Sequence, residues 1–242
     1  MIAIKDLVVQ FGGVRPIDGL TCELTAPVSG LIGPNGAGKT TLLNVLSGFV
    51  RPIQGSVRMD TTDLTALNAV ERVKSGLRRS FQTEQVVDDL TVQQNIEAIA
   101  DHVSATGRKH AEVVRALHFA GLAPVAGVIG SALNLFQRRL VELAKCLVGT
   151  PRLVLLDEPA AGLSNEESAT LRDLILRLPE EFGVQVLVID HDVELIRSMC
   201  RQTLVLDYGK MLALGDTGTV LASPQVRAAY LGEPVSGDEN VQ

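Results

Sequence analysis

The chain has 242 residues, enough for one or two domains with a large core. Hydrophobic residues make up 46% and charged residues 21%, a globular composition that excludes an intrinsically disordered chain. The net charge of −6 disfavours a nucleic-acid-binding protein, which usually presents a basic face.

The three cysteines, Cys22, Cys146 and Cys200, lie far apart without a C-x-x-C pair. This spacing favours buried thiols in a reducing compartment over a disulfide framework or a zinc site. No apolar run approaches the roughly 18 residues of a membrane span, and the N-terminus lacks the pattern of a signal peptide. We therefore expect a cytosolic protein that another subunit would hold at a membrane if it acts there.

The first elements are predicted from alternation and apolar runs. Residues 3–24 alternate between apolar and polar with a break at Phe11-Gly12-Gly13, which predicts antiparallel strands joined by a turn. Residues 28–32 are apolar and predict a short buried strand. A helix is expected over 41–47, and Gly48 is its expected C-terminal cap.

The segment between that strand and that helix fits G-x-x-x-x-G-K-[ST], the phosphate loop of nucleotide-binding proteins. Its glycines can turn consecutive N–H groups onto an anion, and the following helix directs its N-terminus at the phosphates. Lys39 supplies a positive charge for the β and γ phosphates, and Thr40 supplies a hydroxyl for Mg²⁺. A glycine-rich turn that binds nothing would not need this lysine and two threonines in register. The candidate nucleotide-binding residues are Gly33, Pro34, Asn35, Gly36, Ala37, Gly38, Lys39, Thr40 and Thr41.

Two further residues are candidates near such a nucleotide. Phe11 would stack on an adenine ring, although a core position suits an apolar residue equally well. Residues 55–60 predict a strand, 70–75 a short helix and 76–82 a strand that ends at Gln82. The amide oxygen of Gln82 would ligate Mg²⁺ or contact an attacking water, whereas a solvated surface position is the ordinary alternative.

The pattern becomes helical between residues 90 and 147. Helices are predicted over 91–102, with Thr91 as N-cap, over 111–120 and over 140–147, with a polar loop at 103–110. This helical segment separates two strand-rich halves, and it is therefore a candidate subdomain.

The second strong motif is Leu153–Pro159. Four apolar residues predict a buried strand that delivers Asp157 and Glu158 at its carboxyl end, where ligands bind in parallel α/β sheets. Asp157 would orient the Mg²⁺ shell, and Glu158 would be the general base for water attacking the γ-phosphate. A helix cap or surface turn is the alternative for such a pair.

A similar design follows at residues 184–192. The apolar strand predicted there is followed by His191, whose imidazole would hydrogen-bond the γ-phosphate or the water and so distinguish ATP from ADP. Residues 203–214 predict a hairpin, 218–222 and 225–230 predict short helices, and 237–242 form a polar, frayed end.

These motifs in this order resemble the ATP-binding subunits of ABC transporters, over almost the whole chain. Several segments resemble one branch, the ATPases of branched-chain amino acid uptake systems and their amide or urea relatives. Those segments are Phe11-Gly12-Gly13, Gly76–Gln82, Asp157–Leu163, Leu206–Lys210 and Ala229-Tyr230-Leu231-Gly232-Glu233.

The resemblance implies an α/β P-loop NTPase fold. A RecA-like core with an antiparallel β subdomain would comprise residues 1–82 and 151–242, and a helical signature subdomain residues 83–150. Two such subunits would sandwich two ATP molecules, each between one phosphate loop and the other chain's signature. The implied partners are membrane permease subunits, contacted near residues 82–90, a second ATPase subunit and, indirectly, a solute-binding protein. The implied location is the inner face of the cell membrane.

The chain departs from the family at its signature, usually LSGGQ or LSYGQ. Asn134, Leu135, Phe136 and Gln137 occupy that place. Asn134 replaces a serine that bonds the γ-phosphate and could still donate through its amide, whereas the ring of Phe136 replaces a glycine whose N–H approaches the phosphate. We therefore expect a heterodimer, with a homodimer as the alternative. In the heterodimer, the composite site built on this chain's Lys39, Glu158 and His191 turns over and the other site is degenerate.

Other classes of protein remain as alternatives. One alternative is an ABC ATPase for lipid or lipopolysaccharide export, against which only the branch-specific segments argue. A soluble ABC protein acting on nucleic acid would need a coiled-coil insertion or a second cassette. A P-loop kinase or GTPase would leave the helical segment and His191 unexplained, and the N-K-x-D segment that recognises guanine is missing. A subunit that binds ATP with little hydrolysis would suit Phe136.

Overall fold

The computed structural model describes residues 1–231. The chain forms two compact units, the first made of Met1–Ala69 with the described residues from Leu187 onward, and the second of Val70–Val186. The boundary between them falls within strand β8 (Gln185–Ile189).

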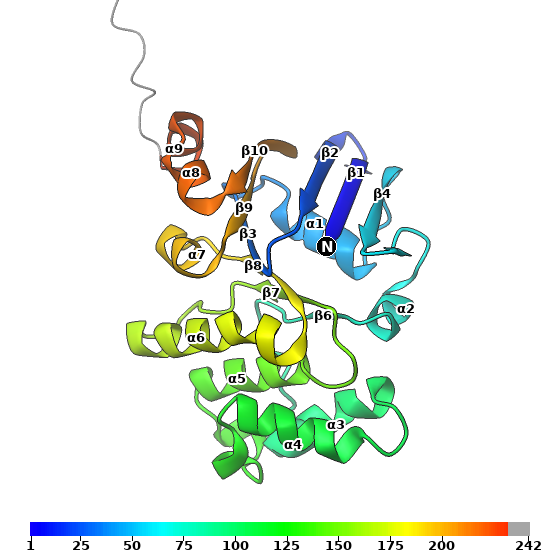
Figure 1. The fold of residues 1–242 in the computed structure, drawn as a ribbon, viewed down its shortest axis with the longest axis vertical. Coiled ribbons are helices and arrows are strands. Elements are labelled where there is room, and N and C mark those ends of the chain that lie inside the picture. The colour runs from blue at the N-terminus through cyan, green and yellow to red at the C-terminus, as the bar shows by residue number, and fades with distance from the viewer. Residues whose placement is uncertain (232–242) are drawn as a thin grey trace, which may run out of the picture. The chain divides into compact units, whose positions relative to one another are not determined.

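The first unit opens with an antiparallel sheet. Strands β1 (Ile2–Phe11) and β2 (Val14–Leu24) pair across a turn at Gly12-Gly13, as the alternation predicts. Strands β4 (Gln54–Met59) and β5 (Thr62–Asp63) extend the sheet in the order β2-β1-β4-β5 (Figure 1).

The rest of the first unit is built around β3 (Val28–Ile32), whose five residues are all buried. Strand β3 lies parallel to β9 (Gln202–Asp207), which pairs antiparallel with β10 (Lys210–Asp216). The helices of this unit are α1 (Lys39–Ser47), α7 (Val193–Met199), α8 (Thr217–Ala222) and α9 (Pro224–Leu231). The predicted strand, hairpin and short helices of this part are confirmed.

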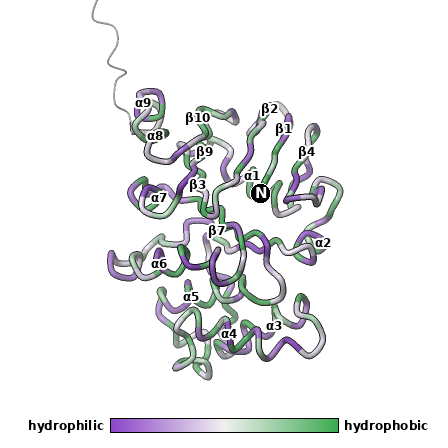
Figure 2. Tube along the Cα trace, viewed as in Figure 1, coloured by the Kyte–Doolittle hydropathy of each residue, from purple (hydrophilic) through white to green (hydrophobic). Residues whose placement is uncertain are grey.

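The second unit joins parallel strands β6 (Leu77–Arg79) and β7 (Leu153–Asp157) to a group of helices. Its helices are α2 (Ala69–Lys74), α3 (Val92–Val103), α4 (Lys109–Phe119), α5 (Leu135–Lys145) and α6 (Asn165–Phe182). Helices α3, α4 and α5 contact one another, and hydrophobic and hydrophilic residues alternate along them (Figures 1 and 2).

Three of these helices begin with the same local signal. Thr91, Asn134 and Ser164 are N-caps whose side chains accept the N–H of the residue three positions later. In each case the side chain of that later residue, Gln94, Gln137 or Glu167, caps in return, which completes a capping box. The predicted cap at Thr91 is confirmed.

Several predicted boundaries are wrong. The strand predicted over 76–82 ends at Arg79, which is the last residue to pair with β7, opposite Leu155. The N–H of Ser80 adds one more backbone bond, to Leu155, and Gln82 follows in a bend. The helix predicted over 140–147 begins at Leu135, because Asn134 caps it. The loop predicted over 103–110 is shorter, since α3 ends at Val103 and α4 begins at Lys109.

Helices α6 and α7 were not predicted, although Ser164 and Asp192 are capping residues at their starts. The predicted polar end at 237–242, and the Gly232-Glu233 pair, lie outside the described residues. Within residues 1–231, no helix combines the length and the apolar character that a membrane crossing requires.

Candidate functional site

The phosphate loop lies in the first unit, between β3 and α1. Gly38 has φ +104°, in the region that favours glycine, and a Cβ there would lie 2.2 Å from the carbonyl oxygen of Pro16. Gly33 is equally constrained, because a Cβ would lie 2.2 Å from the carbonyl oxygen of Leu206. The neighbouring strands β2 and β9 thus fix the loop's shape, which leaves no room for side chains at these two positions.

The loop leads directly into α1, which begins at Lys39 with Gly38 as its N-cap. Gly38 offers no side chain to cap the first turn, so this N-terminus is suited to an anion. Lys39 Nζ donates to the carbonyl oxygens of Gly33 and Pro34, at 2.6 and 2.9 Å, and its ammonium therefore lies over the loop. Thr40 is exposed on the first turn, where its hydroxyl can meet a ligand.

Phe11 and His191 also belong to the first unit. Phe11 ends β1 and is 54% exposed, which rules out the core alternative for its ring. His191 follows β8 with its side chain 69% exposed, and its Nδ1 lies 3.6 Å from Oδ1 of the buried Asp190. Asp190 also accepts the N–H of Asp192, the N-cap of α7, so the turn that carries the imidazole is fixed from both sides.

The acidic pair lies in the second unit, at the carboxyl end of β7. Asp157 is buried, and its Oδ2 lies 3.1 Å from Nη2 of Arg79, whose side chain is buried too. The N–H of Asp157 donates to Oγ of Ser80, at 3.3 Å, so the neighbouring strand segment holds both its backbone and its carboxylate. The ion pair with Arg79 therefore orients the carboxylate of Asp157 at the end of the strand.

Glu158 comes next, with φ +47°, a left-handed conformation that few non-glycine residues adopt. Such strain costs on the order of 1–3 kcal/mol and clusters at functional sites. The carbonyl of Glu158 accepts the N–H of Ala161, which closes the turn. Gln82 Nε2 donates to Oε2 of Glu158, at 3.2 Å, so the structure brings together the predicted glutamine and the predicted base.

The signature segment forms the start of α5. Oδ1 of Asn134 accepts the N–H of Gln137 at 2.8 Å, and Oε1 of Gln137 accepts the N–H of Asn134 at 3.1 Å. The side-chain oxygen of Asn134 is therefore engaged in capping. Phe136 is half-buried and Leu135 is exposed, so two apolar side chains stand in the first turn.

The predicted residues thus form two groups. The loop, Phe11 and His191 belong to the first unit, whereas Gln82, Asp157, Glu158 and the signature belong to the second. Sequence reasoning missed Arg79, although it lies in a segment that resembles the amino acid uptake branch. The sequence did offer one indication of its role. Arg79 is a charged residue in a short predicted strand, and a charged side chain that is buried there requires a partner.

Comparison with known proteins identifies the family of the chain. A family model described as "ABC transporter" matches residues 24–161. The branched-chain amino acid transport ATP-binding proteins BraF of Pseudomonas aeruginosa and LivG of Escherichia coli K12 are 33% and 32% identical, over 96% of this chain and 98% of each relative. The lipopolysaccharide export system ATP-binding protein LptB of Acidithiobacillus ferridurans is 33% identical, over 86% of this chain and 87% of its own.

A solved structure supports the same assignment. The ADP conformation of MJ1267, an ATP-binding cassette of an ABC transporter, is 26% identical, with a TM-score of 0.84 over 96% of this chain and 99% of its own. The predicted resemblance and the α/β P-loop NTPase fold with an antiparallel β subdomain are therefore confirmed. The chain belongs to the ABC transporter family, as a nucleotide-binding ATPase subunit.

Proposed function

We propose that this subunit energises uptake of branched-chain or related amino acids, or of small amides. The observation that carries the proposal is the match to BraF and LivG over nearly the whole of both chains. The segments that resemble the amino acid uptake branch also support the proposal. Some of them lie outside the candidate site, so the resemblance is not limited to residues that any ATPase of the family needs. Import would then be driven by closure of two ATPase subunits on ATP and their opening after hydrolysis.

Residues of the first unit carry the proposed contacts to ATP. Phe11 stacks on the adenine, the loop amides and Lys39 hold the phosphates, and His191 contacts the γ-phosphate. The division into a core at residues 1–82 and 151–242 and a helical subdomain at 83–150 remains part of this proposal.

The residues present suit a magnesium ion. Thr40, Gln82 and Asp157 offer a hydroxyl, an amide and a carboxylate, all of them oxygen donors of the kind that Mg²⁺ prefers. The pairing of Asp157 with Arg79 orients the carboxylate for this role. Bound Mg²⁺ would offset the charge that develops on the β and γ phosphate oxygens.

Glu158 is the proposed general base. It takes a proton from the water as the water oxygen bonds to the γ-phosphorus and the bond to the ADP oxygen breaks, which gives ADP and phosphate. Its hydrogen bond to Gln82 places the carboxylate against a side chain that can also hold the water. Lys39 stabilises the phosphoryl oxygens in the same step.

The altered signature supports a heterodimer. Phe136 introduces a Cβ and a ring where relatives approach the partner's nucleotide with a glycine N–H, and the side-chain oxygen of Asn134 is engaged in its cap. A partner ATPase with an intact signature would complete the site on this chain, and the reciprocal site would turn over slowly. The remaining partners are permease subunits, contacted near residues 82–90, with a solute-binding protein acting through them. The subunit would lie on the cytoplasmic face of the membrane.

Lipopolysaccharide export is the second candidate, because LptB matches at similar identity over a smaller share of both chains. Transport in a strain that lacks this gene separates the two. We expect the wild-type gene to restore uptake of labelled leucine or a small amide, and Lys39→Ala to fail. Exposed Lys74 provides the matched control, since Lys74→Ala should restore uptake. If the deletion strain takes up leucine and amides normally but loses lipopolysaccharide from its surface, the subunit serves lipopolysaccharide export and not uptake.

A further inference from the structure

The buried guanidinium of Arg139 contacts two separate segments of the second unit. Arg139 lies on α5, two residues after the signature, and only 8% of it is exposed. Its Nη1 lies 3.1 Å from Oε1 of Glu84 and donates to the backbone carbonyl of Gln82 at 3.0 Å. Its Nη2 donates to the backbone carbonyl of Ala161 at 3.3 Å.

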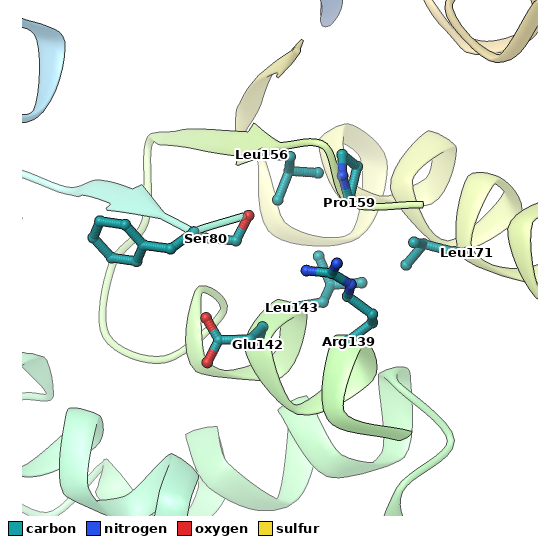
Figure 3. Close-up of a pocket in the computed structure, with 8 residues that line it drawn as sticks. Ser80, Arg139, Glu142, Leu143, Leu156, Pro159 and Leu171 are labelled. Carbon is teal, nitrogen blue, oxygen red and sulfur yellow. The ribbon is translucent and has the colours of Figure 1, made fainter. Parts of the chain in front are cut away.

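Two of these contacts hold segments that carry proposed site residues. The carbonyl of Gln82 belongs to the residue whose amide bonds Glu158, and Ala161 closes the turn that begins at Glu158. Figure 3 shows the side chain of Arg139 reaching from α5 toward Pro159, the residue after Glu158. A single side chain therefore connects the signature helix to both groups that would handle the attacking water.

Stability alone does not account for this arrangement. Nε of Arg139 is buried without a hydrogen-bond partner, and a small cavity lined by Ser80, Arg139 and Glu142 adjoins it. Burying a charge with an unsatisfied donor opposes folding, and apolar replacements of buried ion pairs are often neutral or stabilising. The neighbouring Arg138 differs, because it pairs with Asp88 and with the carbonyl of Gly130, away from both segments.

We infer that Arg139 is a positioning residue that transmits movement of the signature helix to Gln82 and to the turn of Glu158. The inference rests on the proposed function. When α5 shifts as the dimer closes, the guanidinium moves both carbonyls together, so the glutamine and the base reach their working positions at the same time. Arg139 is buried and acts through the two carbonyls, so its effect is on kcat rather than on the KM for ATP.

The test compares Arg139→Met, Arg139→Lys and the control Arg138→Met in the full chain. Hydrogen exchange without nucleotide should become faster in both segments, residues 80–85 and 158–163, in Arg139→Met and in neither with Arg138→Met. In the complex with its transport partners, Arg139→Met should lower kcat by about 10-fold or more with KM for ATP unchanged, because displacement of catalytic groups by about 1 Å can cost 100-fold. Arg139→Lys keeps the charge beside Glu84, and it should recover part of kcat.

Wild-type kcat in Arg139→Met, or faster exchange in only one of the two segments, would overturn the inference. If Arg139→Met does not fold, Arg139→Lys and Glu84→Gln supply the same comparison, because each removes part of the contact set. Equilibrium binding of Mg²⁺-ATP to the wild-type chain tests the proposed function separately. If the wild-type chain binds Mg²⁺-ATP but Arg139→Met keeps the wild-type kcat, the inference about Arg139 fails and the proposed function stands. If the wild-type chain does not bind Mg²⁺-ATP, the proposed function itself fails.

Discussion

Glu158 combines a strained backbone with a defined partner. Its φ of +47° is maintained by the end of a buried strand on one side and a closed turn on the other, and Gln82 bonds its carboxylate. The side chain is therefore held in one place before any substrate arrives, which is the arrangement that a general base requires. Arg79 does the same for Asp157 through the buried ion pair.

Replacement of Glu158 by glutamine should lower turnover of the assembled complex by about 100-fold or more, because general-base catalysis contributes that much. The amide keeps the shape of the side chain, so ATP binding should persist. Steady-state ATPase assays and equilibrium binding measure the two effects. Glu166, an exposed carboxylate in the first turn of α6, provides the control, since Glu166→Gln should leave both unchanged. Unchanged turnover in Glu158→Gln would remove this residue from the mechanism.

The three cysteines are buried and free, as the sequence predicts. Burial raises the pKa of Cys22, Cys146 and Cys200 to about 12, with a smaller contribution from nearby acidic residues. Because the folded-state pKa lies above the unfolded value of about 8.5, the fold favours the neutral thiol. The associated stability is fully present below about pH 8.5 and is lost as the pH rises toward 12.

Alkylation should therefore be slow in the folded chain, because the thiolate is the reactive form. At pH 8 a thiol with a pKa of about 12 is ionised in only about one molecule in 10,000. We expect iodoacetamide to label the native chain slowly, with a rate that rises about tenfold per pH unit between 8 and 10. In urea the thiols should label rapidly, and the labelling rate should level off above the ordinary pKa of a cysteine, about 8.5. A plateau near pH 9 in the folded chain would contradict the assigned burial.

At the scale of elements, the buried strands were predicted well, because a strand that is buried on both faces appears in the sequence as a short run of mainly apolar residues. The runs at 28–32, 153–156 and 184–189 match β3, β7 and β8 within a residue. Boundaries failed where a partner decides them. The strand before Gln82 pairs with β7 only from Leu77 to Arg79, so its length depends on a partner more than 70 residues away.

Helix α6 should depend on its capping box. Ser164 Oγ accepts the N–H of Glu167 and donates to Oε2 of the same residue. Ser164→Ala should destabilise the chain by about 1 kcal/mol, because it leaves an N-terminal donor without a side-chain acceptor. The midpoint of urea unfolding measures this loss. Thr170→Ala is the control, since that exposed hydroxyl only bonds the carbonyl of Glu166 within the helix and should cost little. Equal effects of the two variants would argue against the cap.

For the whole molecule, the altered signature predicts how the chain assembles. In a Glu158→Gln background, which should trap bound ATP, the isolated chain should remain monomeric with Mg²⁺-ATP. Adding Phe136→Gly should allow a homodimer, because the glycine N–H can then approach the partner's phosphate. Light scattering after gel filtration measures the mass, and the substitution should cost about 1 kcal/mol of helix stability.

Lys39→Ala provides the control for this assembly, since the loss of the loop's ammonium should return the Phe136→Gly chain to a monomer. A stable homodimer of the chain that retains Phe136 would contradict the proposed heterodimer. It would show that the ring does not block the interface.

The residues of the phosphate loop, the acidic pair and His191 could be recognised from the sequence by itself, because the chemistry of each motif is carried by neighbours in the chain. The family and the α/β fold followed from their order, and the comparisons confirm both. The exposure of Phe11, the strained φ of Glu158 and the contacts of Arg79 and Arg139 required the folded chain. A buried guanidinium takes its partners from whichever segments packing brings within 3 to 4 Å, and Arg79 meets a residue 78 positions away. Such partners follow from packing between distant segments, and no local pattern encodes them.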